Sequence, residues 1–432
     1  MSGRTCDPRR GAVLAIGDEL LGGETLDRNS AWISARLAEI GVAIGEHRTV
    51  GDDVAAIAGA FDELRSRHRV VIATGGLGPT LDDCTREGLA RSLGVDLVED
   101  PAAAEHLERW FAERGRPMPM ANRSQAMRPA TAICLANPNG TAPGLLVGDA
   151  AAALIACLPG PPREMQPMFR EVVVPRLATG QGLVRRTRLV HACGAGESDL
   201  AAKLGELMEA GRTPQVGITA SHGVVTARIR AEGPAAEIGA TLDAAAEEIE
   251  RRWGPYAFGR DETTLAEATA AALVADRRTL SVAESCTAGM LGEMLVAVSG
   301  ASAFFEGGWL VYSNALKSSQ LGVPESVLAT HGAVSEPTAA LLAMAAASRA
   351  GTDLALSVTG VAGPSGGSEQ KPVGTVFIGL CDRREGPARV RRFRFPGDRD
   401  AVRRRSAMSA VSMLRLHLAG QEAVRLLWEW PG

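Results

Sequence analysis

The chain has 432 residues, 46% of them apolar and 22% charged, which is typical of globular proteins and long enough for two or three domains. Its 46 basic and 50 acidic side chains give a net charge of −4, which argues against binding to nucleic acid or to an anionic membrane. No apolar run approaches the ~20 residues that span a bilayer, and the seven cysteines include no C-x-x-C pair. We therefore expect a cytoplasmic protein without a disulfide framework.

The first 175 residues alternate strand and helix patterns. Strands are expected at residues 12–17, 42–50 and 69–76, the first short and buried and the third fully apolar, and a helical pattern follows each of them. This order predicts an α/β domain over residues 11–178, with a doubly wound, mostly parallel sheet covered on both faces. Ligands of such sheets bind at the carboxyl ends of the strands.

Two polar turns lie at that expected edge of the sheet. The segment TGGLGPTLDD (74–83) has three glycines, which let a phosphate approach the backbone, and ends in Asp82 and Asp83. The turn after the first strand adds Asp18, Glu19 and Glu24. Because carboxylates repel a phosphate, we expect a divalent cation between them. Alternatively, Asp82 or Asp83 only caps the helix expected from about Asp82.

The pattern changes at about residue 185. A small α+β domain is expected over residues 184–259, followed by a C-terminal α/β sandwich over residues 262–420. The tail from residue 421 holds two of the six tryptophans and is expected to pack on a neighbouring surface. Alanine-rich helical faces favour a homodimer.

In the C-terminal domain, Ser285 follows a strand pattern at the mouth of an expected helix. Unpaired backbone amides at such a place suit a developing oxyanion or a phosphate. A serine nucleophile needs a base, and a buried lysine with a lowered pKa can serve; Lys317 is one of only three lysines among the 46 basic residues. The alternatives are that Ser285 is only a helix cap, or that Cys286 is the nucleophile. His331 is expected to make a structural contact.

Two further segments could bind an anion. A strand pattern ends at Thr359, and a glycine-rich loop that contains Lys371 follows it. Backbone N–H groups of such a loop can cradle an anion, although a plain hairpin loop has the same composition. Arg399 lies just before a helix pattern, where a guanidinium could hold a phosphate with two hydrogen bonds.

In order and spacing, AESCTAG, FFEGGWLVYSNALK, HGAVSE, SVTGVAGPSGG, KPVGTV and PGDRDAVR resemble the CinA C-terminal family, known as nicotinamide mononucleotide deamidases. The resemblance implies an amidohydrolase without a cofactor, in which Ser285 is the nucleophile, Lys317 the base and Tyr312 a partner of this dyad. The substrate-binding positions that it implies are Thr287, Gly289, Thr359, Gly360 and Arg399. Ala288 and Ser365 depart from the family pattern, because glycine is usual at both positions.

The N-terminal turns, together with NPNGTAPG (137–144) and LPGPPREM (158–165), resemble the molybdopterin-binding fold of the MoaB and MogA proteins. The match extends through the N-terminal branch of the CinA family, and GAGES (194–198) also fits full-length members. In some relatives this domain hydrolyses the pyrophosphate of ADP-ribose with a divalent metal ion, with or without a monovalent cation. The phosphate-binding residues implied here are Gly75, Gly76, Gly78, Thr80 and Asn29, and the metal ligands are Asp18, Asp82 and Asp83.

Three functions compete at this point. The first is a nucleotide-recycling enzyme that acts on small-molecule nucleotides. The second is a pterin- or nucleotide-binding module without catalysis, tied to competence or DNA damage. The third is an enzyme acting on another amide or on a molybdopterin intermediate. A serine paired with a lysine favours the first over the second, because a module that only binds has no need of a base.

Overall fold

The computed structural model describes residues 10–148, 153–177 and 183–430. The chain divides into two compact units, one formed by residues 1–186 with 232–239 and the other by residues 187–231 with 240–432. Among the described residues no helix is both long and apolar enough to cross a membrane. The domain boundary expected near residue 178, and Cys6, lie outside the described residues.

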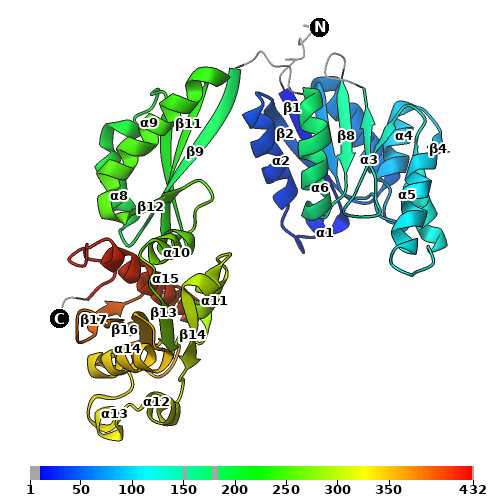
Figure 1. Cartoon of the computed structure of the whole chain (residues 1–432). Helices are drawn as coiled ribbons and strands as arrows, with labels where there is room; N and C mark the ends of the chain where they lie inside the picture. Colours follow the sequence, from blue (N-terminus) through cyan, green and yellow to red (C-terminus); the bar gives the residue numbers. More distant parts are fainter. Residues whose placement is uncertain (1–9, 149–152, 178–182, 431–432) are drawn as a thin grey trace. The chain divides into compact units, whose positions relative to one another are not determined.

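The first unit is built on a six-stranded sheet with the order β2-β1-β3-β8-β7-β6 (Figure 1). Strands β2, β1, β3 and β8 are parallel, and β7 and β6 continue the sheet antiparallel. Its strands are β1 (Arg10–Ile16), β2 (Ala43–Val50), β3 (Val70–Thr74), β6 (Ile133–Leu135), β7 (Gly144–Val147) and β8 (Leu154–Leu158), and a separate pair is formed by β4 (Leu97–Glu99) and β5 (Met127–Pro129). Its helices are α1 (Asp18–Leu21), α2 (Arg28–Glu39), α3 (Val54–Arg67), α4 (Thr85–Leu93), α5 (Pro101–Ala112), α6 (Pro162–Met168) and α7 (Val174–Leu177).

Helices cover both faces of this sheet. One core joins α2 and α6 to the face that carries Val13 and Ile72, and the other joins α3 and α4 to the face that carries Leu14 and Val71. Alternate residues of each buried strand therefore point to opposite helical layers. This confirms the predicted doubly wound, mostly parallel sheet.

The second unit begins with a four-stranded sheet of order β10-β11-β9-β12. Its elements are β9 (Leu183–Cys193), α8 (Glu197–Leu204), β10 (Gln215–Ser221), β11 (Val224–Pro234), α9 (Ala235–Trp253) and β12 (Ala257–Arg260). The indole of Trp253 is fully buried and donates to the carbonyl of Leu200, which ties α9 to α8. The predicted small α+β fold is present.

The rest of this unit is a five-stranded sheet of order β14-β13-β15-β16-β17. Strands β14, β13 and β15 are parallel, and β16 and β17 are antiparallel to their neighbours. The strands are β13 (Leu280–Glu284), β14 (Phe305–Leu310), β15 (Leu354–Gly360), β16 (Thr375–Asp382) and β17 (Arg389–Arg394). The helices are α10 (Leu265–Ala275), α11 (Met290–Val296), α12 (Asn314–Leu321), α13 (Glu325–His331), α14 (Glu336–Ala350) and α15 (Arg399–Leu418).

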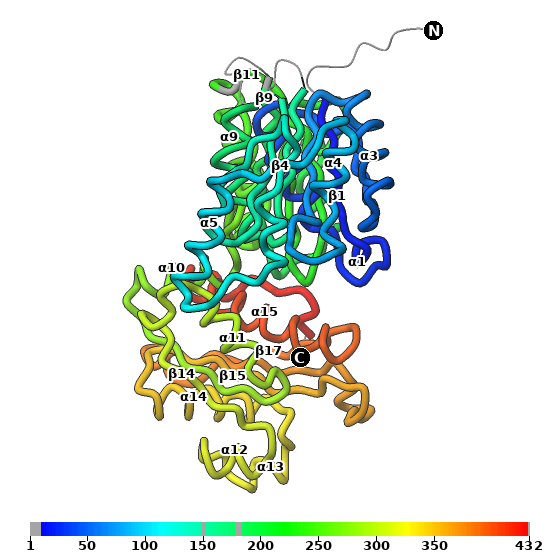
Figure 2. The backbone as a smooth tube through the Cα atoms, turned by 90° about the vertical axis from the view of Figure 1, so that its right-hand side faces the viewer, coloured from blue at the N-terminus to red at the C-terminus, as the bar shows by residue number. Residues whose placement is uncertain are grey.

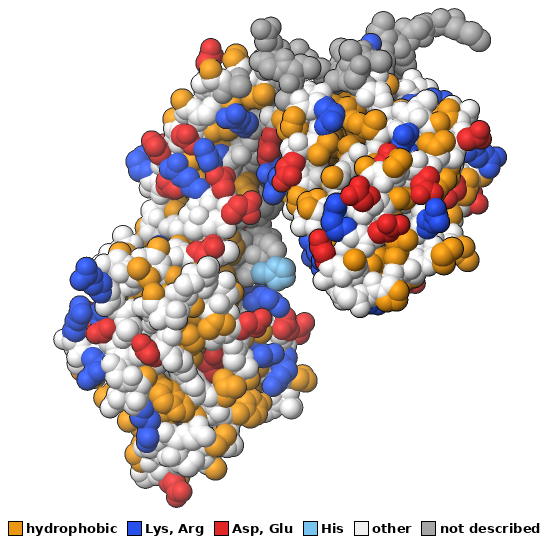
Figure 3. Space-filling model, turned by 45° about the vertical axis from the view of Figure 1, so that its right-hand side comes forward, with side chains coloured by type: hydrophobic (Ala, Val, Ile, Leu, Met, Phe, Trp, Pro, Cys, Tyr) orange, Lys and Arg blue, Asp and Glu red, His pale blue; other side chains and the backbone are white. Residues whose placement is uncertain are grey.

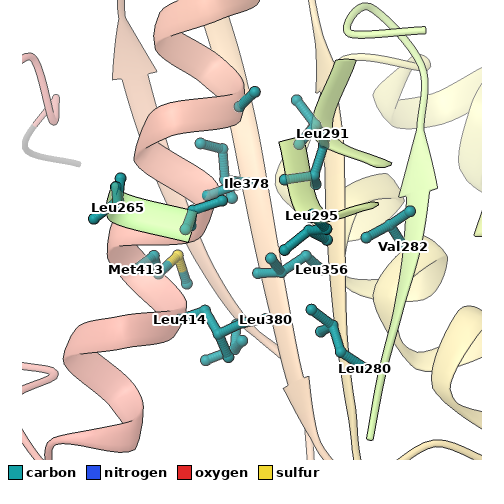
Figure 4. Close-up of a cluster of buried hydrophobic side chains, with 14 of the residues drawn as sticks. Leu265, Leu280, Val282, Leu291, Leu295, Leu356, Ile378, Leu380, Met413 and Leu414 are labelled. Carbon is teal, nitrogen blue, oxygen red and sulfur yellow. The ribbon is translucent and has the colours of Figure 1, made fainter. Parts of the chain in front are cut away.

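The C-terminal sheet lies between two helical layers, as the predicted sandwich requires. Figure 2 shows α11 and α15 on one side of the sheet and α14, with α12 and α13, on the other. On the first side Leu291 and Leu295 of α11 and Met413 of α15 pack against strand residues such as Leu356 (Figure 4). Charged side chains of both signs are interspersed over the surface seen in Figure 3, in keeping with the near-neutral composition.

The C-terminal tail packs on neighbouring surfaces, as predicted. Leu426 is buried in the core of the sandwich, and the amide of Leu427 donates to Gly194 of the small α+β domain at 2.7 Å. Trp428 packs edge-on against Phe395. The tail and α15 thus join the two halves of this unit, since Arg415 also donates to the carbonyl of Ala257.

Candidate functional site

Ser285 and Lys317 meet at the carboxyl end of β13. Ser285 is the first residue after the strand and is held by a hydrogen bond from its amide to Val358 of β15 at 3.0 Å. Lys317 lies on α12, and its Nζ is 3.0 Å from Oγ of Ser285. The expected contact between these two side chains, 32 residues apart in the chain, is therefore confirmed.

Lys317 is only 1% exposed, and its amine also contacts the carbonyl oxygens of Val311 at 2.8 Å and Tyr312 at 3.0 Å. Burial lowers the pKa of Lys317 from its ordinary value. A neutral amine has two N–H groups and one lone pair. In that neutral form the two carbonyls, which can only accept, would take the two N–H groups and leave the lone pair for the hydroxyl of Ser285, whereas the protonated amine donates to Ser285 Oγ as well. This geometry suits a base that removes the serine proton.

Helix α11 begins later than predicted, at Met290, so Ser285 is not its N-cap. The amides at this helix start are not free. Glu284 accepts hydrogen bonds from the amides of Gly289, Leu291 and Gly292 at 2.9, 3.1 and 2.8 Å. The expectation that the helix mouth itself offers unpaired amides was wrong, because a carboxylate of the chain occupies it.

The loop between Ser285 and α11 offers other donors. Among the described residues the amides of Cys286 and Thr287 have no backbone carbonyl partner. Arg403 of α15 donates to the carbonyl of Thr287 at 2.9 Å and fixes the loop from the other side. Donors that follow a nucleophile directly in the chain are well placed for an oxyanion that forms on the attacked carbon.

Cys286 is the rival nucleophile, and its surroundings do not suit that role. The thiol is 4% exposed, and burial raises its pKa to about 12. Since the thiolate is the reactive form, a thiol that stays protonated near neutral pH is a poor nucleophile. Cys286 instead packs in the core of the sandwich.

Ala288 stands where the family pattern has glycine, and its backbone conformation shows why glycine is usual there. Its φ is +47°, in the left-handed region that favours glycine. The usual glycine at this position therefore serves the backbone conformation of the nucleophile loop, and alanine strains it. Gly289 follows with φ +96° and donates its amide to Glu284, so no contact from it to a substrate is needed to explain its presence.

Tyr312 supports the dyad through its backbone rather than its ring. Its carbonyl receives the Lys317 amine, whereas its phenol is 60% exposed and receives a hydrogen bond from Arg399 at 3.2 Å. Arg399 also donates to the carbonyl of Gly363 in the glycine-rich loop at 2.8 Å. Tyr312 thus contacts the dyad through its carbonyl, while its phenol contacts the exposed guanidinium of Arg399.

Thr359 lies at the end of β15 and is fully buried. Its hydroxyl donates to the carbonyl of Ala333 at 2.7 Å, so the side chain holds the loop before α14 rather than facing an open site. Gly360 pairs with Val376 on β16, and a Cβ there would lie 2.6 Å from the Val376 side chain. Lys371 donates to the carbonyl of His331 at 2.7 Å, which places both residues in structural contacts.

In the first unit the glycine turn after β3 lines a cavity of about 330 Å³. Gly75 has φ +107°, and a Cβ there would lie 2.1 Å from the carbonyl oxygen of Ile16, so only glycine fits. Asn29 lies beside this turn but donates its amide to Thr74 and to the carbonyl of Gly160. The residues that line the cavity are Ile16, Gly17, Glu19, Asp52, Gly75, Gly76, Leu77, Gly78, Pro79, Asp82, Asp83, Gln125, Thr141, Ala142, Pro159, Gly160, Pro161 and Glu164.

The carboxylate of Asp83 accepts hydrogen bonds from its own turn and does not cap a helix. It accepts hydrogen bonds from the amides of Gly78 at 2.6 Å and Thr80 at 2.9 Å and from the Thr80 hydroxyl at 2.5 Å. Helix α4 begins only at Thr85. The helix start at Asp82 was therefore predicted too early, and the cap role of Asp82 or Asp83 is not present.

Asp18 is not among the residues that line this cavity. Its carboxylate accepts the amide of Asp52, and Asp52 accepts the amide of Asp18 in return. Asp18, Asp82 and Asp83 do not converge as three ligands. Among the described residues, the group of three metal-ligating side chains with ligand atoms within 4.8 Å of one another is Asp382, Glu385 and His417 in the other unit.

Asp52 and Glu164 also line this cavity, and neither was predicted from the sequence to belong to a site. Burial raises the pKa of Asp52, and the carboxylates of Asp18, Glu19 and Asp82 raise it further. Such crowding of negative charge is relieved by a bound cation. Glu19, Asp52 and Asp82 all line the cavity, but like Asp18, Asp82 and Asp83 they are not a group with ligand atoms within 4.8 Å of one another among the described residues. A divalent ion held here would take one or two of these carboxylates and complete its shell with phosphate oxygens and water. The next residue, Asp53, caps α3.

Three family models match the chain. "Probable molybdopterin binding domain" matches residues 12–179, "Damage-inducible protein CinA KH domain" residues 187–259, and "CinA C-terminal domain" residues 262–418. A competence-damage inducible protein of Symbiobacterium thermophilum is 42% identical over 94% of this chain and 98% of its own length. A CinA-like protein of Geobacter metallireducens is 42% identical over the same shares. A solved CinA superfamily protein from Klebsiella pneumoniae is 35% identical over 36% of this chain and 96% of that chain, with a TM-score of 0.35.

Proposed function

The chain belongs to the CinA family, and from this premise we propose that its C-terminal domain hydrolyses the carboxamide of nicotinamide mononucleotide, giving nicotinate mononucleotide and ammonia. The observation that carries the proposal is the 3.0 Å contact between the buried Lys317 amine and the Ser285 hydroxyl. Burying a lysine amine costs folding free energy, because the amine loses its hydration. A catalytic role beside a serine accounts for such a buried lysine better than packing does.

The reaction follows from these positions. The neutral amine of Lys317 takes the proton of Ser285 while Oγ attacks the carboxamide carbon. The amides of Cys286 and Thr287 stabilise the oxyanion that develops. Lys317 then passes its proton to the leaving nitrogen, the C–N bond breaks, and ammonia departs. In the second half Lys317 takes a proton from water, hydroxide attacks the ester carbon, and Ser285 recovers its proton.

Arg399 is the group that would recognise the phosphate of the substrate. It lies at the start of α15, is exposed, and is oriented by Tyr312 and by the carbonyl of Gly363. A planar guanidinium held in this way can form two hydrogen bonds with a phosphate. On this proposal the carboxamide of the mononucleotide lies at Ser285 and its phosphate at Arg399, two places that Tyr312 links through its carbonyl and its phenol.

Ammonia release from nicotinamide mononucleotide tests this proposal. The wild-type chain is expected to form ammonia and nicotinate mononucleotide in equal amounts, and Ser285→Ala is expected to lower kcat/KM at least about a thousandfold. If Ser285→Ala keeps near-normal turnover while Cys286→Ala abolishes it, the proposed nucleophile is wrong.

We further propose that the first unit hydrolyses the pyrophosphate of ADP-ribose with a divalent metal ion. The crowding of Glu19, Asp52 and Asp82 beside a glycine turn favours this activity. The test is ADP-ribose turnover with and without added metal. Asp52→Asn is expected to lose the metal-dependent rate, whereas Asp53→Asn, which alters only the cap of α3, is expected to keep it. Metal-independent turnover in all three proteins would contradict the site.

A further inference from the structure

Glu284 is a buried carboxylate that the proposed reaction does not use. It is the last residue of β13, 1% exposed, and directly precedes Ser285. On its strand it pairs with Leu310 of β14 on one side and Val358 of β15 on the other. Its carboxylate receives the amides of Gly289, Leu291 and Gly292.

A buried charge requires compensation, and this one has it. Three amide donors and the positive end of α11 surround the carboxylate. Both oxygens are used, since Oε2 accepts from Gly289 and Leu291 and Oε1 from Gly292. The consequence is geometric: the end of β13 and the start of α11 are fixed to each other through one side chain.

Only residues 285–288 lie between Glu284, at the end of β13, and Gly289, at the start of α11. The loop must therefore close tightly, and Ala288 adopts φ +47° to do so. The loop is fastened elsewhere by the amide of Ser285 on Val358 and by Arg403 on the carbonyl of Thr287. The amide of Met290 also donates to the carbonyl of Thr287 at 3.2 Å, and Glu284 is the side chain that ties the end of β13 to the start of α11.

We propose that Glu284 is a positioning residue for the nucleophile. Its carboxylate accepts hydrogen bonds from the amides at the start of α11 and so holds the loop in place. In this position Oγ of Ser285 faces Lys317, and the amides of Cys286 and Thr287 remain available to the oxyanion. This inference rests on the proposed function of Ser285.

The test uses the full chain and a fluorophosphonate, which reacts with an activated serine and needs no nucleotide. Glu284→Gln keeps the shape of the side chain but brings an amide donor against amide donors, so the loop shifts. Glu284→Asp keeps the charge but shortens the reach. The matched control is Glu267→Gln, since Glu267 also caps a helix in this domain, accepting the amide of Thr264 at 2.8 Å.

Both Glu284 variants are expected to slow the labelling of Ser285 at least about tenfold, because displacements of ~1 Å cost about a hundredfold in reactions of this kind. The kcat for the mononucleotide is expected to fall in parallel, with KM within about threefold of wild type. Glu267→Gln is expected to label at the wild-type rate. A role in folding alone would change the amount of active protein but not the rate constant for each folded molecule.

Equal labelling rate constants for wild type and either folded Glu284 variant would overturn the positioning role while leaving Ser285 as the nucleophile. An unreactive Ser285 in the wild-type protein would overturn both proposals. A third result would separate the two proposals. If the wild-type protein labels at Ser285 but does not hydrolyse nicotinamide mononucleotide, and the Glu284 variants label more slowly, the role of Glu284 is supported and only the proposed substrate is rejected.

Discussion

The Nζ atom of Lys317 lies 3.0 Å from Oγ of Ser285 and touches the carbonyls of Val311 and Tyr312 on its other sides. All four residues come from consecutive elements, because β13 leads to Ser285, β14 ends just before Val311, and α12 carries Lys317. Strands β13 and β14 are parallel neighbours, so both carboxyl ends reach the same edge of the sheet. The dyad is therefore a direct product of the βαβ order of this domain.

The pH dependence of turnover should report the state of Lys317. Burial lowers its pKa, and only the neutral amine can take the serine proton. We therefore expect kcat/KM to be low while Lys317 is protonated and to rise with pH through a single group whose pKa lies below the ~10.4 of a free lysine. Lys317→Arg should lose at least about a thousandfold, since a guanidinium stays protonated. A profile that falls as pH rises from 6 to 9 would contradict this role.

Cys286 should be dispensable for the reaction. Its buried thiol, with a pKa raised to about 12, stays protonated at neutral pH. Cys286→Ala is expected to keep kcat within about threefold and to cost about 1–3 kcal/mol of unfolding free energy from the lost packing. Urea unfolding and ammonia release measure the two effects separately. Loss of turnover in a variant that remains folded would point to the thiol.

Arg399 should affect binding rather than chemistry. Arg399→Ala is expected to raise KM for nicotinamide mononucleotide about 10- to 100-fold and to leave kcat within a few fold, as loss of a charge-assisted contact of about 1.5–3 kcal/mol implies. Nicotinamide riboside, which lacks the phosphate, should be unaffected by the change. Arg404→Ala is the control, because Arg404 on the same helix pairs with the exposed Asp400. An equal effect on both substrates would exclude phosphate recognition by Arg399.

Ala288→Gly should stabilise the protein. The left-handed backbone at φ +47° costs alanine about 1–2 kcal/mol, and glycine avoids that cost but gains freedom in the unfolded chain. We expect a net gain of up to about 1 kcal/mol in unfolding free energy, measured by urea denaturation. A destabilised variant would show that the loop prefers the methyl group.

A buried ion pair far from the dyad should govern stability in acid. Burial alone would raise the pKa of Asp382, but hydrogen bonds from Arg278 and from its other partners, among them His417, hold it well below its usual range. The carboxylate therefore stabilises the fold above the unfolded pKa of ~3.9, and this contribution is lost as pH falls further. Arg278→Met is expected to cost about 3–5 kcal/mol at pH 7, with kcat unchanged in the folded fraction. Thermal unfolding across pH 2–7 checks both statements.

Much of this molecule could be predicted from local sequence. Apolar runs such as residues 12–17 and 69–76 form the buried parallel strands, because strands covered on both faces have no polar side. The pairing of Ser285 with Lys317 was also predictable, since a rare lysine follows a strand-end serine by one βα unit.

The side-chain bonds that fill helix starts and turns could not be predicted. Asp83 was expected as a metal ligand or an N-cap and Glu284 was not singled out, yet both carboxylates accept hydrogen bonds from backbone amides of their own turns. Which amide a carboxylate meets depends on loop closure in three dimensions. The same limit applies to Tyr312, whose contact with Lys317 is made by its carbonyl while its phenol lies against Arg399.

The most direct test of the central claim is the identity of the atom that carries the acyl group during turnover. The wild-type chain would be mixed with nicotinamide mononucleotide, quenched in acid within the first turnovers, digested and analysed by mass spectrometry. We expect the nicotinate mononucleotide acyl group on the peptide that contains Ser285, located at its hydroxyl, and no adduct in Ser285→Ala. An adduct on Cys286, or wild-type turnover by Ser285→Ala, would contradict the account.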